Sequence, residues 1–134
     1  MTGNVAPIWQ PDPDGTGKAA KVFYTYEALR PLTARFTKAQ GDQRFSMIDI
    51  VTPVDGEHSL AWAIMAMNYS HDVPEGQIVV FQDEVTAQDL PIVESQRPEL
   101  LPLDLQAELH LRSDRTAIAY RQWLRQLGLR YGTA

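Results

Sequence analysis

The sequence predicts an α+β fold in which an antiparallel sheet comes first and two helices follow. Between residues 20 and 70, stretches rich in β-branched and aromatic residues are separated by turn-forming residues, a pattern typical of consecutive strands. After residue 75 the apolar residues recur at helical spacing. Strands followed by helices favour an antiparallel sheet with helices gathered on one side. The length of 134 residues suits one compact domain.

Residues 1–19 are expected to form an extended lead-in, and residues 20–134 the domain itself. The lead-in contains three prolines and a turn cluster, namely Pro7, Pro11, Pro13 and residues 14–17. Such residues disfavour regular structure, and terminal segments of this composition are often mobile. We therefore expect part of this lead-in to be mobile.

Three strands are predicted before the first clear hairpin turn. Lys21–Tyr26 is rich in β-branched and aromatic residues, which favour strands. Leu32–Lys38 alternates apolar and polar side chains, which indicates a strand with one solvent-facing side. Gly41 and Asp42 form a turn, and Arg44–Val51 follows as the third strand.

The segment Glu57–Tyr69 permits two interpretations. Its alanines favour a helix. Its position directly after the turn-forming residues 53–56 favours a strand. One set of its residues alternates with small residues and methionines, and this set consists of Leu60, Trp62, Ile64 and Ala66. This alternation fits a strand buried on both faces, so a strand is predicted.

Residues 76–96 are predicted to form the first helix. Apolar positions step by three and four residues along one stripe, which consists of Ile78, Phe81, Val85, Asp89 and Ile92. Arg97 and Pro98 end this helix, and residues 100–111 connect it to the next one.

The final helix is predicted between Ser113 as its N-cap and Gly128 as the residue that follows its C-cap. Its apolar face is formed by Ile118, Trp123, Leu124 and Leu127. Its solvent-facing side is expected to carry Arg112, Arg115, Arg121 and Arg125.

Composition excludes several classes of function. Twelve Lys and Arg against 17 Asp and Glu give a net charge of −5, which offers no basic surface for nucleic acid or an anionic membrane. The chain has no cysteine, so disulfides, thiolate metal sites and cysteine nucleophiles are excluded within it. Its longest apolar run, Leu60–Met67, is far too short to cross a bilayer. With no signal-peptide pattern at its start, a cytoplasmic location is expected.

Asp89 departs from the pattern of its helix, because it lies in the apolar stripe. An unpaired carboxylate on an inward-facing side is energetically costly, and Pro91 disturbs the same helical turn. One interpretation is a metal ligand or general base. Another is a capping role, since Thr86 precedes Asp89 at capping-box spacing, or an ordinary ion pair.

The segment Gln88–Pro98 (QDLPIVESQRP) resembles a signature of the oxygenase component of Rieske non-haem iron oxygenases. The most similar group is the vanillate O-demethylase and phenoxybenzoate dioxygenase-like enzymes. The resemblance continues in short motifs on both sides, namely Tyr24–Glu27, Leu29–Leu32, Val51–Pro53, Leu101–Asp104, Glu108–His110 and Tyr120–Leu124. It covers about residues 20–130 and is densest in the last 50 residues.

This resemblance implies a helix-grip fold of the START and Bet v1 type, in which a curved antiparallel sheet wraps around a long helix. In the family, a mononuclear non-haem Fe(II) is held by two histidines and one carboxylate. Because the family's carboxylate falls in the matching motif, the resemblance assigns it to Asp89. Glu94 matches a second recurrent position, which the resemblance places beside the metal ligands in a supporting role.

Two parts of the family's machinery are missing from this chain. The [2Fe-2S] Rieske cluster needs cysteine–histidine pairs, and the chain has no cysteine. The iron histidines of the family come from an H-x4-H element, whereas His58 and His71 are 13 residues apart and His110 is remote. With three or four predicted strands, the sheet is also expected to be incomplete. The chain therefore resembles the C-terminal portion of an oxygenase catalytic domain, and a shortened product, a split gene and a relic all remain open.

Two functional hypotheses follow. In the first, the chain supplies the iron carboxylate and pocket walls for O2-dependent hydroxylation or O-demethylation of an aromatic substrate. It would act only with the N-terminal oxygenase portion and a reductase as partners. The pocket candidates, each of which could equally be a core residue, are Trp62, Ile64, Met65, Met67 and Phe81. In the second, it is a non-catalytic module that binds an apolar ligand or a subunit, with exposed strand edges that favour self-association.

Overall fold

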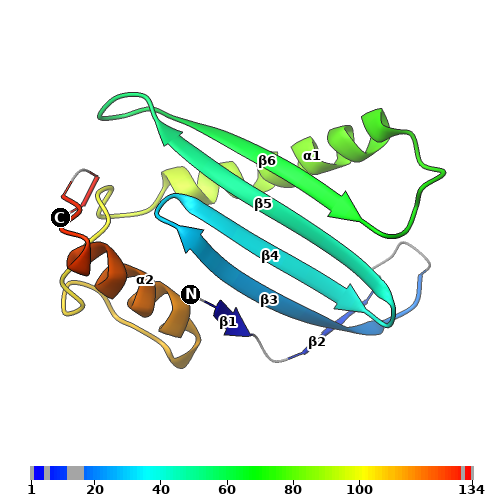
Figure 1. The fold of residues 1–134 in the computed structure, drawn as a ribbon, viewed down its shortest axis with the longest axis horizontal. Coiled ribbons are helices and arrows are strands. Elements are labelled where there is room, and N and C mark those ends of the chain that lie inside the picture. Colours follow the sequence, from blue (N-terminus) through cyan, green and yellow to red (C-terminus); the bar gives the residue numbers. More distant parts are fainter. Residues whose placement is uncertain (1, 5–6, 12–16, 131, 134) are drawn as a thin grey trace.

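The computed structural model describes residues 2–4, 7–11, 17–130 and 132–133. An antiparallel sheet is followed by two α-helices, so the predicted α+β class is confirmed (Figure 1). The elements are β1 (Thr2–Asn4), β2 (Ile8–Gln10), β3 (Ala20–Arg30), β4 (Thr33–Gln40), β5 (Gln43–Pro53), β6 (Ser59–Met67), α1 (Glu75–Glu94), the 3-10 turn η1 (Arg112–Asp114) and α2 (Arg115–Gln126).

Four long strands form consecutive antiparallel hairpins in the order β3-β4-β5-β6. The four predicted strands are thereby confirmed. β3 and β5 are longer than predicted at both ends, β4 is shifted by one to two residues, and β6 is two residues shorter at each end. Two short strands in the lead-in, β1 and β2, pair with different parts of β3. These two strands were not predicted, because a strand of three residues is too short to show a recognisable alternation of apolar and polar side chains. The predicted mobility of the lead-in concerns in part residues 12–16, which lie outside the described residues.

The ambiguous segment after the hairpin turn is the strand β6 and not a helix. It pairs with β5 along its full length, from Pro53 opposite Ser59 to Phe45 opposite Met67. The Asp55 carboxylate accepts hydrogen bonds from the backbone N–H groups of residues 57 and 58, both at 2.8 Å, which fixes the turn. The prediction that this strand is buried on both faces was wrong, because most of its residues are exposed.

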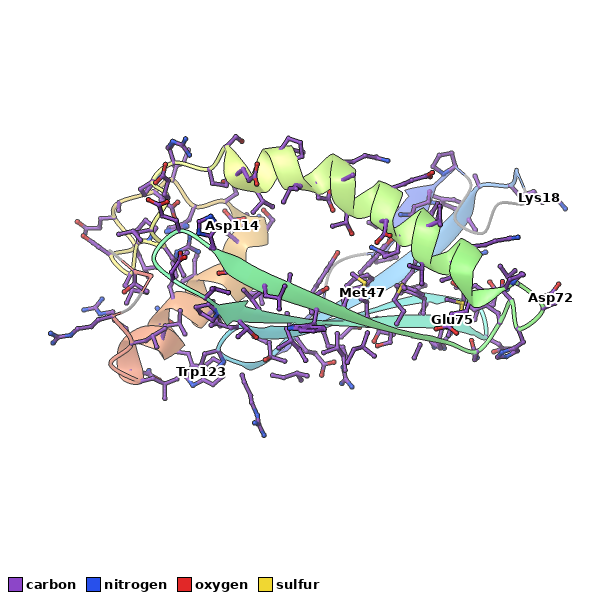
Figure 2. All side chains as sticks on the ribbon, turned by 90° about the horizontal axis from the view of Figure 1, so that it is seen from above. Lys18, Met47, Asp72, Glu75, Asp114 and Trp123 are labelled. Atoms are coloured by element: carbon purple, nitrogen blue, oxygen red, sulfur yellow. The ribbon has the colours of Figure 1, made fainter. Side chains whose placement is uncertain are left out.

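The two faces of the sheet differ in their surroundings. Tyr26, Phe36, Met47 and Met65 lie opposite one another in register on one face, which we call the helix-facing side. Figure 2 shows Met47 on the side of the sheet over which α1 passes. The opposite face, which we call the outer side, carries Ile48, Ile50, Trp62 and Ile64 on β5 and β6. On this side Trp62 is 56% and Ile64 57% exposed.

Helix α1 crosses the helix-facing side without packing closely against it (Figure 2). It is continuous through Pro91, yet none of its residues is buried, and it makes no extensive contact with any strand of the described chain. Ile78 and Val85 are its best-covered apolar residues, whereas Phe81 is 64% exposed. The predicted stripe is helical but not buried. Neither α-helix in the described part of the chain is long and apolar enough to span a membrane.

Helix α2 begins and ends in hydrogen-bonded turns. Ser113 is not its N-cap, as was predicted, because η1 precedes the helix and the Asp114 carboxylate accepts the Leu111 N–H at 2.7 Å. At the other end, Gly128 adopts φ 69°. The Leu129 N–H then bonds the Leu124 carbonyl at 3.1 Å. This is the expected glycine termination.

Arg121 of α2 ties the connecting segment to the helix. Its guanidinium lies 2.6 Å from the Glu108 carboxylate and donates a second hydrogen bond to the Pro102 carbonyl at 3.1 Å. The predicted solvent-facing position of Arg121 was therefore wrong, as was the apolar-face position of Leu127, which is exposed. On the other side of α2, β1 lies so close that a Cβ at Gly3 would collide with Thr116.

The described fold buries few side chains. Among the described residues, the buried apolar side chains are Val22, Leu124 and Pro102. The accessible surface is 10128 Å². A compact monomer of 15.1 kDa would expose about 7,100 Å². The excess, on the order of 3,000 Å² by the same relation, is as large as an obligate protein–protein interface.

Asp49 interrupts the apolar row of the helix-facing side. In β5 it lies between Met47 and Val51 on this side, and its cross-strand neighbours are Ala34 and Ala63. Burial among these apolar groups raises the pKa of the Asp49 carboxyl above its ordinary value of 3.8. Asp49 accepts no hydrogen bond from any described residue.

Arg121→Ala is expected to lower the free energy of unfolding by about 1–3 kcal/mol, because it leaves the half-buried Glu108 without its partner. Urea denaturation followed by circular dichroism measures this change. Arg125→Ala, an exposed position on the same helix, is the control and should change stability by about 0.5 kcal/mol or less. Equal effects of the two substitutions would contradict the role given to the ion pair.

Asp49→Asn is expected to alter how stability depends on pH. Above pH 3.8 the unfolded carboxyl ionises first, whereas the folded one does so only at its raised pKa. The unfolded chain therefore binds fewer protons in this window, and the stability of the native sequence falls as the pH rises through it. The asparagine variant lacks this decline. Urea midpoints measured from about pH 3 to pH 7 test this, and a constant difference between the two proteins would refute it.

Candidate functional site

Asp89 lies on the side of α1 that faces the sheet. At about 100° per residue, it follows Ile78 and Val85 on the same helical side, and these are the best-covered apolar residues of α1. Asp89 itself is exposed and makes no salt bridge with any described residue. The capping interpretation is excluded, because α1 is continuous there and the Thr86 hydroxyl donates to the Gln82 carbonyl at 2.9 Å. A carboxylate without a partner is left projecting toward the sheet.

Glu94 is the last residue of α1 and lies on another side of the helix. Five residues separate it from Asp89, which corresponds to about 140° around the axis. Its backbone carbonyl accepts a hydrogen bond from the Arg97 guanidinium at 3.2 Å. Its carboxylate makes no contact with Asp89 that would support a metal ligand directly.

The three histidines do not gather around Asp89. His58 lies in the β5–β6 turn, where its Nδ1 is 3.0 Å from the Asp55 carboxylate. His71 lies in the connection between β6 and α1. The Nε2 atom of His110 is buried and has no hydrogen-bond partner among the described residues.

The described residues do not form an iron site by themselves. Among the residues that the structure describes, no three His, Cys, Asp or Glu side chains form a group that could bind a metal ion. A mononuclear iron site of the two-histidine, one-carboxylate kind needs three such groups. Asp89 can therefore be at most one ligand of a site that other groups complete.

The predicted pocket residues fall on different surfaces. Met65 and Met67 project from β6 on the helix-facing side and are partly covered. Trp62 and Ile64 project from the same strand to the outer side. Phe81 is exposed on α1. One pocket cannot be lined by all five side chains, and only the two methionines share the side of the sheet that α1 crosses.

An open cavity of about 720 Å³ lies where the sheet meets η1 and α2. Its walls include Tyr26, Phe36, Asp49 and Val51 of the sheet and Tyr120 of α2. The Tyr120 hydroxyl accepts a hydrogen bond from the Leu32 N–H at 3.0 Å, which joins α2 to the β3–β4 turn. None of the residues that line this cavity belongs to α1, so it is separate from the surroundings of Asp89.

Asp49 is the functional candidate that sequence reasoning missed. Its signal was present in the third strand, where Phe45, Met47, Asp49 and Val51 alternate with the other face and only Asp49 is charged. The same argument that singled out Asp89 on its helix applies to a strand with a period of two.

An aromatic cluster stiffens the helix-facing side next to this cavity. The ring centroids of Tyr24 and Tyr26 are 6.0 Å apart, and those of Tyr26 and Phe36 are 6.2 Å apart. Phe36 also lies 5.7 Å from Phe45. Burial raises the pKa of the Tyr26 hydroxyl, with a smaller contribution from Tyr24. These rings form a mainly apolar wall, with which aromatic groups can make favourable contacts.

Comparison with known proteins identifies relatives along almost the whole chain. The probable methylxanthine N7-demethylase NdmC of Pseudomonas sp. (strain TJI-51) is 33% identical over 130 residues, which are 92% of this chain and 45% of the relative. The methylxanthine N1-demethylase NdmA of Pseudomonas putida is 30% identical over 104 residues, or 78% of this chain and 28% of the relative. The chain thus spans less than half the length of these relatives.

A solved structure shares the same fold. The NdmA QL mutant of Pseudomonas putida CBB5 with caffeine superposes with a TM-score of 0.66 and 26% sequence identity. The match covers 81% of this chain and 34% of that chain. The family model for the vanillate O-demethylase oxygenase C-terminal domain matches residues 2–130. The chain therefore belongs to the vanillate O-demethylase oxygenase C-terminal domain family, a family of Rieske oxygenase C-terminal domains.

Proposed function

We propose that this chain is the C-terminal portion of a Rieske-type oxygenase catalytic domain and that Asp89 is its carboxylate ligand for a mononuclear non-haem Fe(II). The observation that carries this proposal is the placement of Asp89. It is a carboxylate without a partner on the sheet-facing side of a helix that nothing in the described chain covers. Its position lies inside the segment that the family model matches.

The other parts of the machinery would come from another polypeptide or polypeptide segment. The described chain offers neither a three-residue metal site nor a cysteine for a [2Fe-2S] cluster. Its relatives are more than twice as long as the matched region. The large uncovered surface on both sides of α1 and β6 supports an N-terminal oxygenase portion as the partner that fills it. A reductase would then supply electrons to the completed oxygenase.

The substrate pocket would lie between α1 and the helix-facing side of the sheet. Met65 and Met67 face this space, together with Met47 of β5. Methionine side chains adapt to apolar ligands of different shapes and make favourable contacts with aromatic rings. Of the other predicted pocket residues, Phe81 lies on α1 near the side of the helix that borders this space. Trp62 and Ile64 would instead serve contacts on the outer side.

The reaction proposed for the complete assembly is O2-dependent oxidation of an aromatic or heteroaromatic substrate, such as hydroxylation or removal of a methyl group. The family name indicates O-demethylation, and the relatives are named as N-demethylases of methylxanthines. This chain would contribute an iron ligand, one wall of the pocket and exclusion of water from one side of the site. Bound iron would supply the oxygen-activating chemistry.

A second candidate function is a non-catalytic module that binds an apolar ligand or another subunit. It is favoured by the absence of a metal-binding group among the described residues. Among the described strands, β6 pairs only with β5, which leaves this edge of the described sheet open to another strand. In this case the chain would associate with itself through that edge.

An iron-binding assay separates the two candidates. The chain is co-expressed with the polypeptide encoded immediately upstream, and iron is quantified per complex under anaerobic conditions. The proposal predicts about one mononuclear iron per complex, with a 10- to 100-fold or greater loss of affinity in Asp89→Ala. Asp83→Ala, an exposed carboxylate on another side of α1, is the matched control and should bind iron normally.

Two results would refute the metal role. One is iron that binds equally well to the Asp89→Ala complex. The other is a stable complex that contains no mononuclear iron, which would favour the non-catalytic module. The chain alone, measured in parallel, should bind no stoichiometric iron.

A further inference from the structure

We propose that the open cavity between the sheet and α2 is a second ligand site, which binds a flat aromatic compound carrying a cationic N–H group. Tyr26, Phe36 and Tyr120 would hold the ring, and Asp49 would accept the N–H hydrogen bonds. This site belongs to the chain itself and includes neither Asp89 nor any other residue of α1.

The walls of the cavity suit a flat ring. Tyr26 and Phe36 lie side by side on the helix-facing side, with their planes 41° apart. Tyr120 closes the site from α2, and its hydroxyl is held by the Leu32 N–H. A volume of about 720 Å³ is in the range of small-molecule sites, which are mostly apolar with few polar groups.

Asp49 is the polar group that this apolar wall presents. Its cross-strand neighbours are both alanines, Ala34 and Ala63, so no large side chain on the adjacent strands covers the carboxylate. It accepts no hydrogen bond from any described residue. Burial already disfavours its charged form, as the raised pKa indicates. A cationic donor placed against it would offset that cost.

The other charged residues that line the cavity are engaged or directed elsewhere. Glu27 and Arg35 form an ion pair at 2.6 Å and project to the outer side. Asp114 accepts hydrogen bonds from a backbone N–H at 2.7 Å and a serine hydroxyl at 3.2 Å. Arg30 lies opposite Thr33 in the strand register. Because Thr33 is on the outer side and residues directly opposite each other share a face, Arg30 is on the outer side as well. Asp49 is therefore the lining carboxylate left to bind a ligand, which selects for cations and against anions.

A matched pair of probes tests this site on the purified 134-residue chain. Benzamidine carries a flat ring and a cationic N–H group, whereas benzoate has the same ring and an anionic group. We expect benzamidine to bind with one-to-one stoichiometry and to shift the NMR signals of Tyr26, Phe36 and Tyr120. The affinity for benzoate should be lower by a factor of roughly ten or more. Isothermal titration gives both affinities.

Substitution of Asp49 supplies the second arm. Asp49→Asn should reduce benzamidine affinity by roughly tenfold or more, whereas Asp83→Asn, an exposed carboxylate on α1, should leave it unchanged. Asp49→Leu should abolish binding while its Tm stays equal to or above that of the native chain, because an unpaired carboxylate in an apolar wall does not stabilise the fold.

Four outcomes would overturn the proposal. The first is absence of benzamidine binding to the native chain, and the second is equal binding of benzamidine and benzoate. The third is benzamidine binding that survives Asp49→Asn, and the fourth is a lowered Tm of Asp49→Leu, which would show that the carboxylate serves the fold. None of these outcomes bears on iron, because Asp89 is intact in every variant.

Discussion

The backbone ladder of β3, β4, β5 and β6 is the interaction on which the rest of this structure depends. Few side chains are buried, so hydrogen bonds between adjacent strands, and not a large apolar core, define the shape. Everything else is placed relative to this ladder. The short strands β1 and β2 attach to its β3 edge, α2 is held at its end through Tyr120, and α1 passes over one face. Net folding stability must therefore be small, because apolar burial is its main favourable term.

The same shortage of burial explains the proposed function. A helix with many exposed apolar residues and a sheet with an open edge are expensive in water, and surfaces of this kind mark interaction sites. The relatives that match this chain are more than twice the matched length. Asp89 projects from α1 toward the sheet. In the proposed assembly, a partner that covers α1 would lie next to this space and would supply the further ligands of the metal site proposed there.

Sequence reasoning predicted the elements well, because side-chain periods are local. Three of the four long strands, both helices and the glycine at residue 128 left clear patterns, whereas the segment of β6 also permitted a helix. It failed where the outcome depends on tertiary contacts. Burial of Trp62 and Ile64 was expected from their apolar character, but no described element covers the outer side there. The helical spacing predicted a solvent-facing Arg121, yet its guanidinium pairs with the Glu108 carboxylate. Glu108 belongs to the segment that connects the two helices, which has no regular hydrophobic pattern from which its position could be predicted. Asp49 was predictable from strand alternation, whereas its cavity needs α2 as a second wall.

Hydrogen–deuterium exchange tests the central claim, that α1 is completed by another polypeptide, most directly. In the chain alone, the amides of α1 should exchange much faster than those of β4 and β5, because no packing opposes local opening of the helix. When the upstream polypeptide is present, the amides of residues 78–92 should become protected, while those of the central strands change little. Strong protection of α1 in the chain alone, or no gain in protection in the complex, would contradict the account.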